Sequence, residues 1–246
     1  MDTTGKFFET LLHQEAIETL VIPISAHTRE NLVVLDEAAN LQYRFGMPGP
    51  AIHENEWREC LKKLRDCNGC EYVVISGSNA PGVPLEFYAE AAEIIKQKNA
   101  KLIIDTSEEA LEHALNAGVF FAKPNLGELS GLSGVKELDA GCVVDAARKI
   151  INKGKCEVMV VSMGPAGAML VTANEHYHEA APAVKIKSTV GAGDSMLAGI
   201  IIALQKKWPW KNVLRYGVAA GTAATMNAGT ELCKKEDVEK IYSFFQ

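Results

Sequence analysis

The sequence lacks any apolar run that approaches the roughly 18–20 residues needed to cross a bilayer. Its first residues, Met1 to Lys6, also lack the basic and then apolar segments of a secretory signal. Basic residues are not in excess, since 25 Lys and Arg stand against 31 Asp and Glu and form no long tract. We therefore expect a cytoplasmic protein that binds neither membrane nor nucleic acid. Any phosphate must then be held by a local device such as a helix N-terminus.

Cysteine is sparse for a disulfide-stapled protein, with 6 residues in 246. A chain of this length can bury a core of its own, so we expect reduced thiols. Cys67-Asn68-Gly69-Cys70 has the spacing of a zinc half-site. Because no second such pair follows, we favour reduced thiols over a metal site as the interpretation of this motif.

Short apolar runs alternate with longer segments of helical periodicity over most of the chain. This order predicts an α/β protein whose mostly parallel sheet carries helices on both faces. The predicted strands are Tyr72–Ser76, Lys101–Asp105, Val119–Ala122 and Val158–Ser162. The predicted helices are Leu85–Lys98, Ser107–Asn116, Ala140–Lys153, Asp194–Lys206 and Lys211–Asn227, with Gly118, Gly154 and Gly229 where helices should stop.

Residues 20–45 follow another pattern. Val21–Ile24, Leu32–Leu35 and Gln42–Phe45 are strand-like runs set too closely for helices between them. They predict a small antiparallel sheet that projects as a lid. The expected organisation is therefore an α/β core of residues 1–19 and 46–246 with a β-strand lid of residues 20–45.

The most informative motif is Ser188-Thr189-Val190-Gly191-Ala192-Gly193-Asp194, which leads directly into an apolar helical run. Glycines allow backbone amides to approach an anion, and a helix N-terminus adds unpaired donors. A carboxylate at Asp194 would stand beside a phosphoryl group bound there and could take a proton from an attacking hydroxyl. The plainer alternative is a polar cap after a flexible turn.

Two further motifs accompany this one, Lys123-Pro124-Asn125-Leu126-Gly127-Glu128 and Ser162-Met163-Gly164-Pro165-Ala166-Gly167. Together the motifs resemble those of the ribokinase-like (PfkB) carbohydrate kinases. The resemblance implies a three-layer αβα sandwich with a small β-sheet lid. It further implies that Asp194 is the general base and that Gly191, Ala192 and Gly193 form an anion hole.

The same resemblance implies ATP, Mg²⁺ and possible K⁺ as cofactors. The implied nucleotide-binding residues are Lys123, Asn125, Ser162, Gly164, Gly167, Ala220, Gly221 and Asn227. Asn125 and Glu128 would organise magnesium, in part through water, because this ion prefers oxygen ligands. The implied potassium loop comprises Ser188, Val190, Ala224, Asn227 and Gly229, although Glu231 stands where relatives often have Arg. Helix capping by Pro124 and Glu128, and close packing of helices along residues 217–224, are the structural alternatives.

On the sugar side the sequence resembles the phosphofructokinase branch, and in particular minor-type bacterial 6-phosphofructokinases. Arg29 is implied to bind a sugar phosphate, since its planar fork can hold two oxygens, and Ser78 to add a hydroxyl. A solvated Arg29 is the alternative, and the sequence after Ser78 departs from the family pattern. The expected reaction is phosphorylation of fructose-6-phosphate by ATP, with tagatose-6-phosphate or fructose-1-phosphate as other acceptors.

Family members begin with a strand and a glycine motif that have no counterpart here, so the first strand of the fold is expected to be missing. The chain is therefore interpreted as an N-terminally shortened kinase. A catalytically incomplete nucleotide-binding fragment is the alternative from another functional class. Because strand edges pair readily, the lid is expected to form a homodimer.

Overall fold

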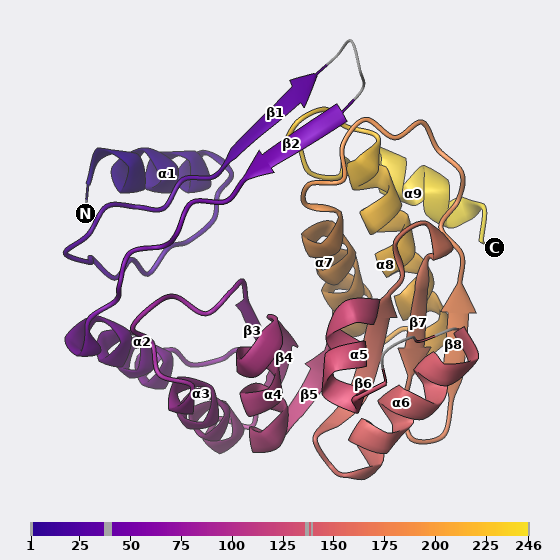
Figure 1. The fold of residues 1–246 in the computed structure, drawn as a ribbon, viewed down its shortest axis with the longest axis horizontal. Helices are drawn as coiled ribbons and strands as arrows, with labels where there is room; N and C mark the ends of the chain where they lie inside the picture. Colours follow the sequence, from indigo (N-terminus) through magenta and orange to yellow (C-terminus); the bar gives the residue numbers. More distant parts are fainter. Residues whose placement is uncertain (1, 37–40, 136–137, 139, 246) are drawn as a thin grey trace. The chain divides into compact units, whose positions relative to one another are not determined.

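The computed structural model describes residues 2–36, 41–135, 138 and 140–245. It divides into two compact units, Met1–Ala117 and Gly118–Gln246, which each combine helices and strands (Figure 1). The sequence predicts a different division, into a core and a lid of residues 20–45. The two compact units do not test that division, which stays a prediction. Every helix among the described residues is too short or too polar to cross a membrane.

The first unit contains two separate pairs of strands. β1 and β2 form an antiparallel pair, with Leu32 opposite Phe45, whereas β3 and β4 are parallel, with Tyr72 opposite Lys101. A helix, α3, connects the two parallel strands. In chain order the elements are α1 (Thr3–Gln14), β1 (Leu32–Asp36), β2 (Leu41–Phe45), α2 (Glu54–Asp66), β3 (Tyr72–Ser76), α3 (Glu86–Gln97), β4 (Lys101–Asp105) and α4 (Glu108–Ala117).

The core of the first unit includes the contact between α2 and α3. Trp57 and Leu61 of α2 pack there against Ala91 and Ile94 of α3. In contrast, α1 buries none of its residues, and Phe7 and its neighbours on this helix are largely exposed. The first unit therefore leaves apolar surface of α1 uncovered.

The second unit is built around parallel β5 and β6, with β7 and β8 added in antiparallel fashion. The strand β7 is buried along its whole length, which explains its uninterrupted apolar sequence. The elements are β5 (Val119–Ala122), α5 (Leu126–Ser133), α6 (Ala140–Asn152), β6 (Cys156–Ser162), the 3₁₀ turn η1 (Gly164–Ala166), β7 (Ala168–Val171), β8 (His176–Glu179), α7 (Ala192–Gln205), α8 (Trp210–Thr225) and α9 (Lys235–Ser243).

Small residues bring α7 and α8 close together. A Cβ atom on Gly199 would lie 2.8 Å from the Cβ of Ala220, and one on Gly217 would lie 2.5 Å from Cγ1 of Ile200. Both distances are shorter than side chains tolerate, so glycine is required at these positions. This packing fixes the direction of α7 and thereby the position of its N-terminal turn.

The strands and helices expected from periodicity are confirmed, with small shifts at their ends. The antiparallel pair within residues 20–45 is confirmed as well, although residues 37–40 lie outside the described residues. One predicted strand, Val21–Ile24, is wrong, because the described residues 2–31 contain no strand. Just after this run, side chains accept hydrogen bonds from the amides of Ser25 and Thr28.

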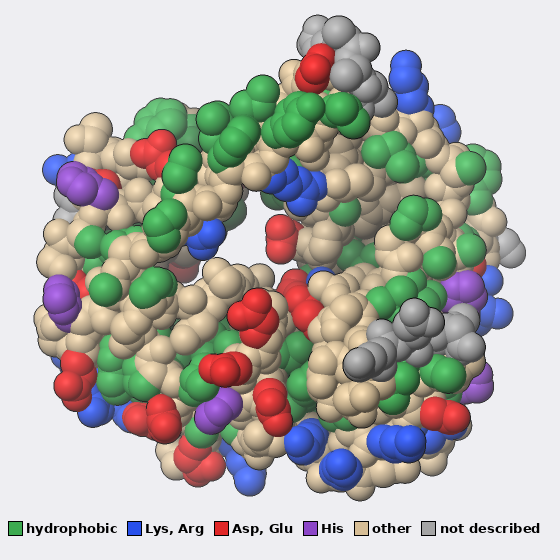
Figure 2. All heavy atoms as spheres, in the orientation of Figure 1, with side chains coloured by type: hydrophobic (Ala, Val, Ile, Leu, Met, Phe, Trp, Pro, Cys, Tyr) green, Lys and Arg blue, Asp and Glu red, His purple; other side chains and the backbone are tan. Residues whose placement is uncertain are grey.

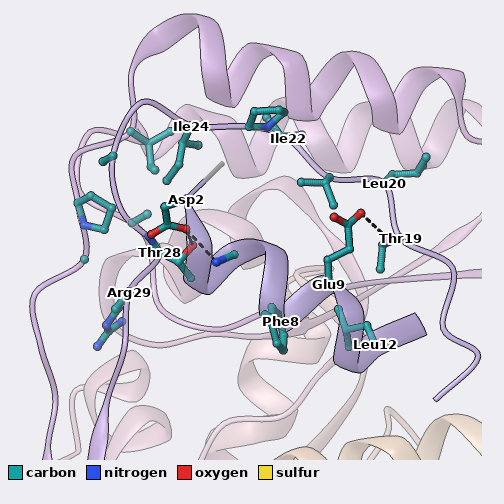
Figure 3. Close-up of a pocket in the computed structure, with 18 of the residues that line it drawn as sticks. Asp2, Phe8, Glu9, Leu12, Thr19, Leu20, Ile22, Ile24, Thr28 and Arg29 are labelled. Atoms are coloured by element: carbon teal, nitrogen blue, oxygen red, sulfur yellow. Dashed lines mark hydrogen bonds between the residues drawn. The ribbon is translucent and has the colours of Figure 1, made fainter. Parts of the chain in front are cut away.

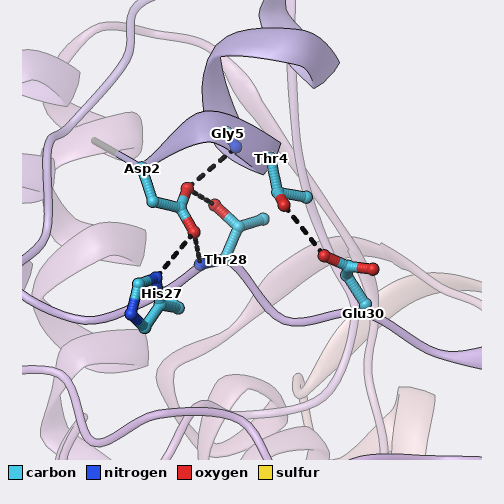
Figure 4. A network of polar contacts seen from close by, with 6 residues as sticks. All are labelled: Asp2, Thr4, Gly5, His27, Thr28 and Glu30. Atoms are coloured by element: carbon cyan, nitrogen blue, oxygen red, sulfur yellow. Dashed lines mark hydrogen bonds and ion pairs between the residues drawn. The ribbon is translucent and has the colours of Figure 1, made fainter.

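Two carboxylates hold the segment that precedes β1. Asp2 caps α1 by accepting a bond from the Gly5 amide (2.8 Å), and it also accepts one from the Thr28 amide (2.9 Å) (Figure 4). Glu56 of α2 accepts bonds from the amides of Ser25 (2.6 Å) and His53 (2.7 Å). The segment is thus tied to the start of α1 and to the start of α2.

These hydrogen bonds favour the ionised carboxylates. The amides of Gly5 and Thr28 hold the pKa of Asp2 well below its ordinary value of 3.8. The amides of His53 and Ser25 likewise lower the pKa of Glu56 below its ordinary value of 4.5. A carboxylate with a lowered folded-state pKa stabilises the fold fully above its unfolded pKa and loses that contribution as the pH falls.

We predict that Asp2→Asn has a lower melting temperature than the native chain at pH 7, because asparagine keeps the cap but not the charge. The native protein should lose stability as the pH falls below about 4.5, and the difference between the two proteins should shrink there. Thermal melts from pH 7 to pH 3 measure this. Glu59→Gln, a change at an exposed carboxylate, serves as the control. A constant difference across this pH range would contradict the assignment.

Candidate active site

The start of α7 combines a left-handed backbone turn with unpaired amides. Gly191 has φ 72° and ψ 2°, a conformation that strains residues other than glycine. Among the described residues, no side chain caps this helix start. The first amides of a helix lack partners within the helix, so those following Gly191 are available to an anion.

Asp194 lies in the first turn of α7 and is exposed. Its carboxylate therefore stands at the same end of the helix as the amides of Ala192 and Gly193. The predicted base and the predicted anion hole occupy one turn of backbone.

Lys123 lies beside this turn, although it precedes Gly191 by 68 positions in the sequence. A Cβ atom on Gly193 would be 3.5 Å from the Lys123 Nζ atom. The lysine residue is only 6% exposed. An ammonium held against the open end of a helix adds positive charge where a phosphate would bind.

Asn125 and Glu128 cap each other's backbone at the start of α5. The Asn125 Oδ1 atom accepts a bond from the Glu128 amide (2.9 Å), and Glu128 Oε2 accepts one from the Asn125 amide (2.8 Å). The structural alternative considered for this motif is therefore present as a reciprocal capping box. Glu128 Oε1 does not take part in the box, so the magnesium role predicted for the pair stays a prediction.

The Lys-Pro-Asn segment and the Ser-x-Gly turn lie side by side. The Ser162 amide donates to the carbonyl of Pro124 at 3.0 Å, and Asn125 and Ser162 form an isolated parallel bridge. After Ser162 the chain turns through Gly164 and Gly167, which have φ of 58° and 87°. Two motifs that are far apart in sequence thus meet at the C-terminal ends of β5 and β6.

A cavity of about 510 Å³ opens beside these motifs within the second unit. This volume lies in the range of small-molecule sites. Its lining includes the predicted residues Ser162, Gly164, Gly167, Ala192, Gly193 and Gly221. The cavity therefore extends from the Ser-x-Gly turn to the start of α7.

Sequence reasoning missed part of this lining. Ala181–Val184, Ile186, Met196, Val218, Thr222 and Thr225 also line the cavity. Ala220, which was expected to bind nucleotide, is not among the lining residues and packs against α7 at Gly199. Helical spacing could have suggested Val218 and Thr225 as companions of Gly221, because residues three or four apart share a face.

The segments of the predicted potassium loop also meet. The Ser188 hydroxyl donates to the Gly229 carbonyl at 2.6 Å and accepts a bond from the Val190 amide at 3.2 Å. Asn227 is buried and donates to the Leu232 carbonyl at 2.8 Å. Ala224 is buried in α8 nearby in sequence. The oxygens of this loop are thus gathered, and its binding of potassium stays a prediction.

Arg29 and Ser78 lie together in the first unit. The Arg29 Nη1 atom is 3.4 Å from the Ser78 hydroxyl oxygen, and both residues are exposed. They contribute to the wall of a cavity of about 660 Å³, whose other walls come from α1 and the extended segment after it (Figure 3). Most of this wall is apolar, including Phe8, Leu12 and Ile22. Asn79, which sequence reasoning did not select, is a further polar group of the lining.

Comparison with known proteins identifies the chain's relatives. The model of the pfkB family carbohydrate kinases matches residues 1–237. The chain belongs to this family. It is 39% identical over 242 residues to the ATP-dependent 6-phosphofructokinase isozyme 2 of Escherichia coli, covering 98% of this chain and 78% of that protein.

Comparison with solved structures supports the same family assignment. The phosphofructokinase-2 of Escherichia coli in complex with potassium aligns with a TM-score of 0.94 at 39% identity, over 99% of this chain and 79% of that one. The ribokinase of Thermotoga maritima aligns with a TM-score of 0.75 at 21% identity, over 98% and 78% of the two chains, a likeness of fold alone. The predicted ribokinase-like α/β fold is thereby confirmed.

We predict that Gly167→Ala strongly destabilises the second unit, because the new Cβ atom would lie 1.9 Å from the Glu179 carbonyl oxygen. The strain of a positive φ and the overpacking together should cost roughly 2–5 kcal/mol. Gly164→Ala is the matched control, since it also has a positive φ but nothing lies within 4 Å of its added Cβ. It should cost only about 1–2 kcal/mol in urea unfolding. Equal losses in the two variants would show that the contact with Glu179 does not matter.

Proposed function

We propose that this pfkB kinase transfers the terminal phosphoryl group of ATP to a hydroxyl of fructose-6-phosphate. The observation that carries the proposal is the start of α7, where open amides and a carboxylate share one turn beside a lysine. Membership of a carbohydrate kinase family supplies the reaction class. We further propose that the protein acts in the cytoplasm, where ATP and sugar phosphates are found.

Asp194 is proposed to act as the general base. Its carboxylate takes the proton of the sugar hydroxyl as the hydroxyl oxygen attacks the terminal phosphorus of ATP, and the bond from that phosphorus to ADP breaks. The amides after Gly191 then stabilise the negative charge on the transferred group, which is the largest electrostatic need of such a reaction. The Lys123 ammonium adds a positive charge at the same place.

The nucleotide is proposed to occupy the cavity of the second unit. Its lining of Gly164, Gly167 and Gly221 lets a flat base and a phosphate chain approach the backbone closely. The apolar side chains Val218 and Met196 provide surface for the base. The nucleotide would lie along the cavity from Ser162 to Gly193, with its phosphates at the Gly193 end.

Asn125 and Glu128 provide oxygen donors suited to hydrated magnesium, which when bound supplies charge neutralisation along the phosphates. Their capping box holds both side chains in place at the start of α5. We also propose that the Ser188 and Gly229 segments hold a potassium ion beside the anion hole. Carbonyl and hydroxyl oxygens are already gathered there.

Arg29 and Ser78 are proposed to bind the phosphate of the sugar. A guanidinium can bind two phosphate oxygens at once, and the hydroxyl 3.4 Å away can add a third contact. Tagatose-6-phosphate and fructose-1-phosphate remain the alternative acceptors, because they differ from fructose-6-phosphate only in stereochemistry or phosphate position.

A non-catalytic nucleotide-binding protein is the second candidate function. The cavity and all the motifs around it lie within the second unit. ATP could therefore bind whether or not a sugar is bound. ATP-dependent thermal stabilisation without ADP release, on each of the three sugar phosphates, would favour this candidate.

The Asp194→Asn variant should turn over fructose-6-phosphate roughly 10²–10⁴-fold more slowly than the native chain, because the base is lost. Its affinity for MgATP should stay close to the native value, since amides and Lys123 bind the phosphates. A coupled ADP-release assay and titration calorimetry measure the two quantities.

Glu236→Gln is the matched control for Asp194→Asn. Glu236 is also an exposed acid in the first turn of a helix, α9, away from the motifs described above. Its turnover should equal that of the native chain. Native turnover in Asp194→Asn would remove this residue from the mechanism.

We propose in addition that two copies associate through one face of the lid hairpin. Leu32 and Phe45 are directly opposite each other in β1 and β2, as are Val34 and Tyr43, and all four are more than 40% exposed. Hydrophobic side chains gather visibly over these strands (Figure 2). The other face carries Gln42 and Arg44, which contact each other at 3.3 Å.

Tyr43→Lys should therefore convert a dimer to a monomer, because it places a charge within the apolar face. Gln42→Lys, one residue away on the other face, where it is opposite Leu35, should leave the dimer intact. Sedimentation velocity at several protein concentrations measures both. A monomeric native chain, or equal behaviour of the two variants, would rule out this interface.

A further inference from the structure

Two cysteines outside the proposed active site lie within contact distance. The Sγ atoms of Cys67 and Cys70 are 3.6 Å apart, close enough for one thiol to donate to the other. Both cysteines lie in the turn that joins α2 to β3. Cys70 is exposed and Cys67 is half-buried, so reagents in solution can reach the pair.

The backbone of the turn brings the two thiols together. Cys67 ends α2, and its amide donates to the Lys63 carbonyl at 2.9 Å. Gly69 has φ 82°, a left-handed conformation that favours glycine and lets the chain reverse between the two cysteines. The 3.6 Å between the two sulfurs is short enough that a small movement would bring them to bonding distance.

A lysine from another helix anchors this turn. The Nζ atom of Lys98, which follows α3, donates to the carbonyl of Arg65 and to Oδ1 of Asn68, the latter at 2.9 Å. Asn68 in turn donates from Nδ2 to the Asp66 carbonyl at 3.0 Å. Asn68, one of the two residues between the cysteines, is therefore held from both sides, and the turn is preorganised.

We propose that Cys67 and Cys70 form a thiol–disulfide exchange site, which reacts with small disulfides such as oxidised glutathione and closes to an intramolecular disulfide. In the first step the Cys67 thiolate attacks one sulfur of the reagent, and one glutathione thiolate leaves. Cys70 then gives its proton to solvent, its thiolate attacks the Cys67 sulfur, and the second glutathione leaves. Two protein thiols are oxidised to one disulfide while one glutathione disulfide is reduced to two thiols.

The two sulfurs are in contact, so either thiol can resolve an adduct formed on the other. The hydrogen bond with Cys67 raises the pKa of the Cys70 thiol. We assign the attack to Cys67, and the Cys70→Ser variant tests this order. Cys70 resolves the adduct because its sulfur already lies beside that of Cys67.

Metal binding explains the pair less well. The described residues contain no cluster of three or more His, Cys, Asp or Glu side chains that could hold a metal ion. A structural zinc site takes four protein ligands, and this turn supplies two. Exchange chemistry needs no more than the two sulfurs that the turn brings together.

The test is incubation of the native protein with oxidised glutathione, followed by acid quenching and peptide mass spectrometry. The peptide that contains both cysteines should lose the mass of two hydrogen atoms. Cys142, an exposed cysteine in α6, should carry at most a glutathione adduct. In Cys70→Ser, the adduct on Cys67 should persist, since nothing resolves it. Separate glutathione adducts on Cys67 and Cys70 in the native protein would overturn the proposal.

The contribution of the turn is tested by the rate of the second step. Gly69→Ala keeps both thiols and meets no atom within 4 Å, but it strains the positive φ, so closure should slow about 5- to 30-fold. Gly69→Asn is the matched control, because asparagine tolerates this conformation, and it should close at nearly the native rate. Closure in urea-unfolded chain should also be slower than in the native protein. Equal rates in native, Gly69→Ala and unfolded chains would overturn the proposal.

Discussion

The glycine turn at the start of α7 is the constraint on which the proposed chemistry depends. A positive φ at Gly191 reverses the chain directly into a helix, and no side chain of the described residues caps the amides that follow. A side chain at this position would also meet Leu232, with its Cβ 2.7 Å from Cδ2. The same turn carries Asp194 and lies beside buried Lys123. The proposed anion site and the proposed base therefore arise from one local backbone conformation, supported by the close packing of α7 on α8.

The two units differ in how much of their apolar surface and strand edges is buried or paired. The second unit contains the motifs proposed to bind nucleotide, a cavity and a strand that is buried throughout. The first leaves α1 without a buried residue, and among the described residues β3 pairs only with β4. The chain spans about four fifths of the length of its Escherichia coli relative. Apolar surface of this kind and an open strand edge are places where further polypeptide can pack or pair.

Much of this structure could be predicted from the sequence, because buried parallel strands and amphipathic helices leave strong periodic patterns. Val21–Ile24 shows where that fails. Its apolar run is β-like, but its neighbourhood is held by Asp2 and Glu56, which lie far away in sequence. The glycine-rich motifs located the candidate site, whereas the Ala181–Val184 wall of the cavity carries no motif. Ala220 is an error in the opposite direction, because it was predicted to bind nucleotide but packs against α7 instead. A small residue is suited to close helix packing as well as to ligand binding.

The most direct measurement of the central claim is a crystal structure of this chain with magnesium and a non-hydrolysable ATP analogue. The adenine base should lie in the cavity of the second unit, and oxygens of the terminal phosphate should accept hydrogen bonds, about 2.7–3.2 Å long, from the amides that follow Gly191. The Asp194 carboxylate should face that phosphate. A terminal phosphate bound away from the start of α7, or a nucleotide bound outside this cavity, would contradict the account.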